Sequence, residues 1–285
     1  RQAFLDEDKE KAAQLTRNNF NGLAAYEEKD ETPFRFGSFT TMGELYVETG
    51  LNELRMSNYR RILSLDSAMV VVQFDKDGVQ YQRKYFISYP DSVMVMKFTA
   101  NQSGKQNLIL SYCPNSEAKS NLRADGKDGL VYTGVLDNNG MKFAFRIKAI
   151  HKGGTLEAEN DRLIVKGADE VFLLTADTDY KMNFNPDFKD PKTYVGNDPE
   201  QTTRIMMDQA VQKGYDELYR NHEADYTALF NRVRLQLNPD ISTPNLPTYQ
   251  RLANYKKGTP DYQLEQLYYQ FGRYLLIASS RPGNM

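Results

Sequence analysis

The chain has 285 residues, with 36 Lys and Arg against 38 Asp and Glu, so its formal net charge is −2 at pH 7. No basic block and no acidic tail is present, which argues against nucleic acid as a partner and against a solvating arm. A single cysteine, Cys113, excludes an internal disulfide, and no run of about 20 apolar residues predicts a membrane span. The length fits one large β domain or two ordinary domains.

The N-terminal segment is polar and charged and does not form a signal peptide, so the signal of an exported parent would precede Arg1. A helix is predicted from Ala3 to Phe20, because its acidic residues precede its basic ones, as the helix dipole favours. Residues 21–43 are predicted to form a loop.

From Glu44 onwards apolar residues recur every second position, which predicts strands. Hairpins are predicted around Asp75–Gly78, around Asp137–Gly140 and within Gly153–Gly167. Further strands are expected at 44–48, 91–100, 107–113 and 169–180. At least eight strands at hairpin spacing predict a large antiparallel sandwich, which a loop from Lys181 to Asn197 would close.

The period then changes to 3.6, which predicts helices at 198–215, 215–233, 246–258 and 259–280. Asp198 is the expected N-cap of the first, with Pro199 at its first position. A short strand is predicted at 234–238. Beyond Phe271 the last helix is apolar almost all round, so it needs packing partners that this chain does not supply. We therefore expect a piece of a larger enzyme.

Common catalytic and cofactor motifs are missing or incomplete. Only His151 and His222 could serve a catalytic triad, and a turn role for the first and a hydrogen-bonded packing role for the second are favoured. Two isolated histidines and one cysteine make a zinc site improbable. The segment from Asp75 to Gly78 lacks the third acid of a calcium loop, and no phosphate-binding or dinucleotide-binding glycine pattern occurs. No cofactor is predicted.

Paired carboxylates are the signature of glycosidases, so four acidic residues were considered. Asp169 and Glu170 enter a predicted strand, while Asp177 and Asp179 leave it and share one side of an extended chain. Aspartate is also common at turns, where it bonds to its own backbone. A structural role is therefore favoured for these residues.

Five segments in order carry a family resemblance: MGELYVE at Met42, the run from Tyr59 to Ala100, HEADYTALFNRVRLQL at His222, LPTYQRL at Leu246, and FGRYLLIASSRPG at Phe271. Together they resemble glycoside hydrolase family 95, the inverting α-L-fucosidase type. The resemblance implies a β super-sandwich at 1–190, incomplete at its start, and a helical linker with a short strand at 191–258. The first helix of a truncated (α/α)6 catalytic barrel would occupy 259–285.

In that family the catalytic acid and its partners lie in the barrel, and none maps onto this chain. Arg281 and Asn284 are the two candidates for substrate contact, although helix termination at Pro282–Gly283 is the favoured interpretation of this segment. The fold class expected is mostly β: a large antiparallel super-sandwich, then a helical linker and the start of the barrel.

The resemblance implies a non-catalytic scaffold portion of an inverting hydrolase that releases terminal α-L-fucose, or a related L-sugar, from glycans. A bacterial parent in the periplasm or secreted, without metal or organic cofactor, is part of that expectation. The alternatives are a stand-alone carbohydrate-binding or structural sandwich, which the apolar last helix disfavours, and part of a glycoside phosphorylase of similar architecture.

Overall fold

The computed structural model describes residues 8–11, 13–14, 41–52, 54–114, 118–136, 141–179, 197–238 and 246–281. Residues 9–11 and 13–14 of the predicted N-terminal helix are helical, and the rest of that helix lies outside the described residues. The predicted loops at 21–43 and at Lys181–Asn197 also lie almost wholly outside them.

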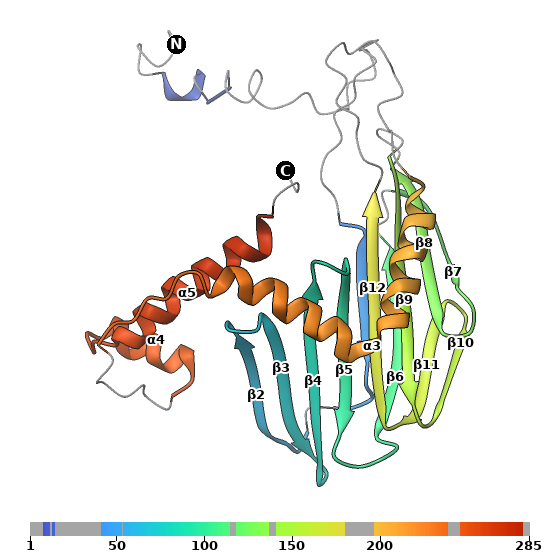
Figure 1. Ribbon diagram of the computed structural model, residues 1–285, viewed down its shortest axis with the longest axis horizontal. Helices are drawn as coiled ribbons and strands as arrows, with labels where there is room; N and C mark the ends of the chain where they lie inside the picture. Colours follow the sequence, from blue (N-terminus) through green and yellow to red (C-terminus); the bar gives the residue numbers. More distant parts are fainter. Residues whose placement is uncertain are drawn as a thin grey trace.

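The described strands form two antiparallel sheets (Figure 1). The large sheet has the spatial order β2-β3-β4-β5-β12-β9-β8-β7 and the small sheet has the order β1-β6-β11-β10. The strands of the large sheet are β2 (Met56–Ser64), β3 (Met69–Lys76), β4 (Val79–Ser88), β5 (Val93–Ala100), β7 (Ala118–Ala124), β8 (Gly129–Leu136), β9 (Lys142–Lys152) and β12 (Glu170–Asp179). Those of the small sheet are β1 (Gly43–Glu48), β6 (Gln106–Pro114), β10 (Thr155–Glu159) and β11 (Arg162–Ala168).

The main core lies between the two sheets, as expected for a sandwich. Leu110 and Leu163 of the small sheet and Leu173 of the large sheet are completely buried there. Tyr112 of β6 and Tyr132 of β8 bring large rings into the same cluster, with centroids 5.0 Å apart. The predicted mostly-β sandwich followed by helices is therefore confirmed.

Two of the three predicted hairpins have turns that the structure describes. Asp77 and Gly78 join β3 to β4 with φ values of 48° and 76°, and Asn160 and Asp161 join β10 to β11 with values of 48° and 59°. Such paired positive values suit two-residue hairpins, because their twist matches that of the strands. The turn at 137–140 lies outside the described residues, although β8 and β9 on either side of it pair as predicted.

Gly154→Ala is expected to destabilise the protein by about 2–4 kcal/mol, because a left-handed backbone and an overpacked contact add together. A Cβ at Gly154 would lie 2.2 Å from the backbone oxygen of Lys166. Gly50→Ala is the matched control, since Gly50 has a φ of 66° but open space around its Cβ position. Urea unfolding of both variants measures the difference. Equal losses in the two would show that the steric contact contributes nothing.

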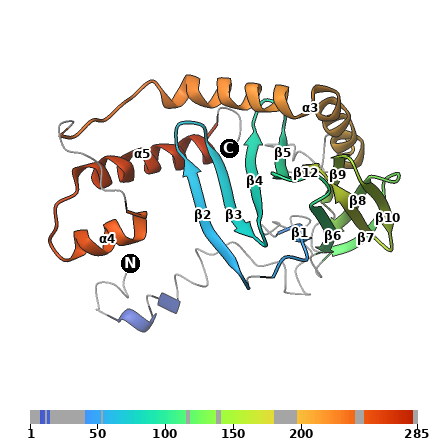
Figure 2. The same ribbon diagram turned by 90° about the horizontal axis from the view of Figure 1, so that it is seen from below.

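One long helix, α3 (Pro199–Phe230), covers the outer face of the large sheet, opposite the small sheet (Figures 1 and 2). As predicted, the Asp198 side chain caps it by accepting from the Glu200 backbone N–H at 3.0 Å, and Pro199 follows at the first position. Gly214 has φ 69° and ψ 174°, which kinks α3 into the two predicted helical segments. Leu218 and Met207 pack from the two halves onto Phe86 and the strands around it.

Hydrogen bonds to backbone carbonyls hold the second half of α3 on the sheet. His222 directs Nδ1 at the Ile87 oxygen (3.0 Å) and Nε2 at the Ser67 oxygen (2.8 Å), and its ring stacks on Phe86. The Tyr226 hydroxyl donates to the Leu65 oxygen at 2.6 Å. His222 thus has the packing role that the sequence favoured.

The prediction of a strand at 234–238 is wrong: the segment has no regular secondary structure. Side chains of the last helix, α5 (Tyr262–Ser279), bind its backbone in place of a neighbouring strand. Arg273 donates to the Val233 oxygen at 2.6 Å, and the Leu237 N–H donates to Gln266 at 3.2 Å. The short helix α4 (Thr248–Lys256) precedes α5, as predicted, and both lie beside the β2 edge of the large sheet (Figures 1 and 2).

Candidate functional site

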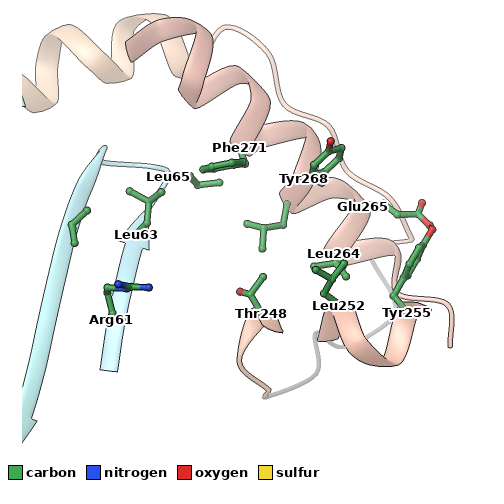
Figure 3. A pocket seen from close by; sticks show the side chains of 12 residues that line it. Arg61, Leu63, Leu65, Thr248, Leu252, Tyr255, Leu264, Glu265, Tyr268 and Phe271 are labelled. Carbon is green, nitrogen blue, oxygen red and sulfur yellow. The ribbon is translucent and has the colours of Figure 1, made fainter. Parts of the chain in front are cut away.

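A cavity of about 660 Å³ lies between the β2–β3 edge of the large sheet and helices α4 and α5 (Figure 3). Its walls are mostly apolar: Leu63 and Leu65 face Leu252 of α4 and Phe271 of α5. The described residues that line it are Arg61, Leu63, Leu65, Val70, Thr248, Leu252, Tyr255, Leu264, Glu265, Leu267, Tyr268 and Phe271.

Glu265 is the only carboxylate in this lining, and it accepts a hydrogen bond from the Tyr255 hydroxyl at 2.7 Å. That bond, followed by the negative charge of Glu265, raises the pKa of Tyr255 above its ordinary value. Glycoside hydrolysis needs two carboxyl groups across the scissile bond. The described residues that line the cavity therefore supply one carboxylate and not the pair that a glycosidase uses.

The exposed surface of α5 is strongly apolar. Tyr268 is 79% exposed and Leu276 is 64% exposed, and Leu275 and Tyr269 are also exposed. Only Leu264 among the residues of α5 is buried. This agrees with the sequence-based expectation that the last helix lacks packing partners within the described part of the chain.

Arg281 follows α5 and is held by two other elements. Its guanidinium forms an ion pair with Asp225 of α3, and its Cζ lies 4.6 Å from the centroid of the Tyr89 ring, next to β4. The side chain is largely buried. These contacts tie the end of α5 to the sandwich and linker, while substrate contact by Arg281 stays a prediction. Asn284 lies outside the described residues.

Asp169 and Glu170 have structural partners. Asp169 accepts a hydrogen bond from the Gly104 N–H at 2.8 Å, which joins two loops. Glu170 pairs with Lys97 of the adjacent β5 at 3.0 Å. Glu170 and Asp177 are seven residues apart on β12, roughly 23 Å at 3.3 Å per residue, which is too far for an acid and base acting on one bond.

Asp177 and Asp179 lie at the end of β12, where the predicted strand at 169–180 also placed them. Both residues pair with β9, with Asp177 opposite Phe145 and Asp179 opposite Phe143. The side chain of Asp179 lies outside the described residues, so a role for this pair stays a prediction.

His151 is exposed near the end of β9, and its Nδ1 lies 2.8 Å from the Gly153 oxygen in the turn that follows, as the favoured turn role requires. Within the described ranges, no group of three His, Cys, Asp or Glu side chains is arranged to hold a metal ion. Of the helices that the structure describes, none has both the length and the apolar character that a membrane span requires.

The polar pair that sequence reasoning missed joins α4 to α5. Arg251 donates to Asp261 through Nε at 2.8 Å and through Nη2 at 2.7 Å, and both residues are buried. The same carboxylate caps α5 by accepting from the Leu264 N–H at 2.9 Å. An aspartate just before a helical pattern signals a cap, but its arginine partner ten residues earlier leaves no local signal.

The comparisons with known proteins agree with a β-sandwich that is followed by helices. A family model described as the glycosyl hydrolase family 65, N-terminal domain, matches residues 1–183. A second model, the glycosyl hydrolase family 95 catalytic domain, matches residues 214–285. The order of these two matches is that of a sandwich domain followed by the start of a catalytic domain of glycosyl hydrolase families.

The chain belongs to the family of the glycosyl hydrolase family 65 N-terminal domain, whose model matches more than half of it. Its C-terminal part is similar to the start of the family 95 catalytic domain. The chain is 30% identical over 90% of its length to "Probable alpha-fucosidase A" of Aspergillus niger. It is 28% identical over 86% of its length to "Alpha-L-fucosidase 2" of Arabidopsis thaliana. The chain spans about a third of the length of these relatives, 32% in each case.

A solved structure described as "Putative kojibiose phosphorylase from human microbiome" superimposes with a TM-score of 0.45 and 9% identity. The alignment covers 66% of this chain and 27% of the other. A likeness of this degree does not bear on the function.

Proposed function

We propose that this chain is the non-catalytic scaffold portion of an inverting glycoside hydrolase that releases terminal α-L-fucose, or a related L-sugar, from glycans. The observation that carries the proposal is the 30% identity to an α-fucosidase over 90% of the chain. A second support is that three carboxylates considered as candidates, those of Asp169, Glu170 and Glu265, have structural partners.

The mechanism proposed for the whole enzyme is a single displacement. One carboxylic acid protonates the leaving oxygen, while a carboxylate base activates water on the opposite face of the sugar. The two carboxyl groups must lie about 6.5–9.5 Å apart to admit that water. We place both groups in the catalytic barrel of the whole enzyme, where the apolar face of α5 would pack.

The glycan would then be bound by the barrel, and a periplasmic or secreted location is part of the same proposal. A stand-alone binding sandwich is a weaker candidate, because Leu276 and Tyr268 would stay exposed to water in it. A phosphorylase would share the scaffold but would need phosphate for cleavage.

The test is fucose release from 2′-fucosyllactose by the protein expressed from its full reading frame, beside this 285-residue chain. We expect release by the longer form alone, in the absence of phosphate. Release by the 285-residue chain would show that it contains a complete site, and Asp169, Glu170, Asp177 and Asp179 would then be replaced. Cleavage that depends on phosphate would replace the hydrolase with a phosphorylase.

A further inference from the structure

A second hollow, of about 470 Å³, lies on the large sheet away from the apolar cavity. It crosses strands β2 to β5, near the end of the sheet where the β3–β4 hairpin turns. Helix α3 crosses these strands nearer their other ends, so it leaves this part of the sheet uncovered (Figure 1). We call the polar side chains that line the hollow the polar shelf: Asn58, Arg60, Gln73, Asp75, Gln80, Gln82, Thr99 and Asn101.

The strand register makes the polar shelf continuous. Arg60 pairs with Gln73, Gln73 with Gln82, and Gln82 with Thr99, so one row of polar side chains crosses four strands. Neighbours in such a row have Cβ atoms about 4.5–5.5 Å apart. Alternation along β4 puts Gln82 on the same face as Phe86, which packs under α3. A sheet face that is apolar under the helix therefore becomes wholly polar beyond it.

Much of the hydrogen-bonding capacity of the polar shelf is unused. Four side chains nearer the hairpin turn are already engaged or next to such a bond. Asn58 donates to Asp75 at 2.6 Å, and Asn101 accepts from the Gln80 N–H at 2.9 Å. Within the described part of the chain, the side chains of Arg60, Gln73 and Gln82 form no hydrogen bond or ion pair. Gln73 and Gln82 are only partly exposed, so they offer donors and acceptors inside a hollow.

The side chains of the polar shelf indicate which class of ligand could bind there. Each amide both donates and accepts, as a sugar hydroxyl does. Arg60 and Asp75 bring one positive and one negative charge, so the polar shelf has no net charge to attract a polyanion. The rings of Phe74 and Tyr81 are buried and stacked on one another at 5.2 Å, so they cannot stack on a nucleic acid base. The position on a sheet face rather than an edge also disfavours an added peptide strand.

We propose that the polar shelf is an accessory binding site for a neutral, hydroxyl-rich oligosaccharide, separate from any catalytic site. It holds a glycan chain by hydrogen bonds alone, through the amides of Gln73 and Gln82 and the guanidinium of Arg60. This goes beyond the proposed function, because binding here requires no hydrolysis and no fucose.

The test measures binding of lacto-N-tetraose, a neutral oligosaccharide without fucose, to the protein expressed from its full reading frame by calorimetry. The variant is Gln73→Ala with Gln82→Ala, the single variant Arg60→Ala is a second probe, and Gln209→Ala on the exposed face of α3 is the matched control. We expect the double variant to bind at least tenfold more weakly and the control to be unchanged, because each amide contributes about fivefold.

Fucose release from 2′-fucosyllactose is measured with the same variants, and we expect its rate to equal that of the wild type. This separates the accessory site from the proposed function. Unfolding midpoints equal to the wild type's confirm that both variants fold. Binding of lacto-N-tetraose that survives in the double variant and in Arg60→Ala would overturn the proposal. So would absence of binding to the wild type, or stronger binding of a heparin tetrasaccharide than of the neutral probe.

Discussion

Asp91→Ala is expected to destabilise the protein by about 3–5 kcal/mol, because it removes the acceptor on which both halves of α3 converge. Asp91 lies in the turn between β4 and β5, and its side chain is almost completely buried. Lys213, just before the kink at Gly214, donates to Oδ1 at 2.6 Å, and Asn221, after the kink, donates at 3.1 Å. Ser88 donates to the other oxygen.

The loss of unfolding free energy in Asp91→Ala should depend on pH. Burial by itself would raise the pKa of Asp91, but hydrogen bonds from Lys213, Ser88 and Asn221 outweigh burial and lower it below its ordinary value of 3.8. A lowered pKa in the folded state means that the carboxylate contributes its stability above the pKa of the unfolded chain, and that this stability disappears as the pH falls through the folded value. The difference between Asp91→Ala and wild type should therefore shrink below about pH 4.

Urea unfolding at pH 7 and at pH 3 measures both effects. Asp91→Asn keeps the shape and loses the charge, so we expect an intermediate loss. Asp216→Ala, an exposed acid on α3, is the matched control and should change the free energy of unfolding by less than about 0.5 kcal/mol. An Asp91→Ala protein as stable as this control would show that the convergence on Asp91 is not a source of stability.

Asp261→Ala is expected to cost about 4 kcal/mol in the stability of the α4–α5 pair. It leaves the buried guanidinium of Arg251 without its partner and removes the cap of α5. The hydrogen bonds from Arg251 hold the pKa of Asp261 below its ordinary value, so this contribution too is present at neutral pH and is lost on acidification. Hydrogen exchange of the α5 amides is the direct measurement, because this pair can open locally.

The matched control combines Arg251→Met with Asp261→Ser. It keeps a capping oxygen and leaves no charge unpaired, so most of the lost protection should return. If exchange of α5 is equally fast in Asp261→Ala and in the double variant, the unpaired Arg251 is not the cause of the loss.

The sequence predicted the elements that carry strong local signals. Asp77–Gly78 and the segment from Gly153 to Gly167 marked hairpins that the structure contains, and Asp198–Pro199 marked the start of α3. Strands β2 and β7 lacked such a signal, because they are the two edges of the large sheet. Their sequences, MSNYRRILS and AKSNLRA, carry polar residues where alternation would need apolar ones.

Pairings between distant segments could not be predicted from local patterns. β12 lies between β5 and β9, and β6 joins β1 to β11, so the order of strands in both sheets depends on tertiary packing. The polar shelf follows from that order, since Arg60, Gln73, Gln82 and Thr99 become neighbours only through register. The segment at 234–238 alternates like a strand, but the side chains of α5 bind its backbone instead.

The most direct test of the central claim is time-resolved proton NMR of 2′-fucosyllactose with the protein expressed from its full reading frame. The account predicts that free fucose appears first as the β-anomer and later equilibrates, because a single displacement inverts the α-linkage. It also predicts no release by the 285-residue chain under the same conditions. Fucose that appears first as the α-anomer, or no fucose from the full-length protein, would contradict the account.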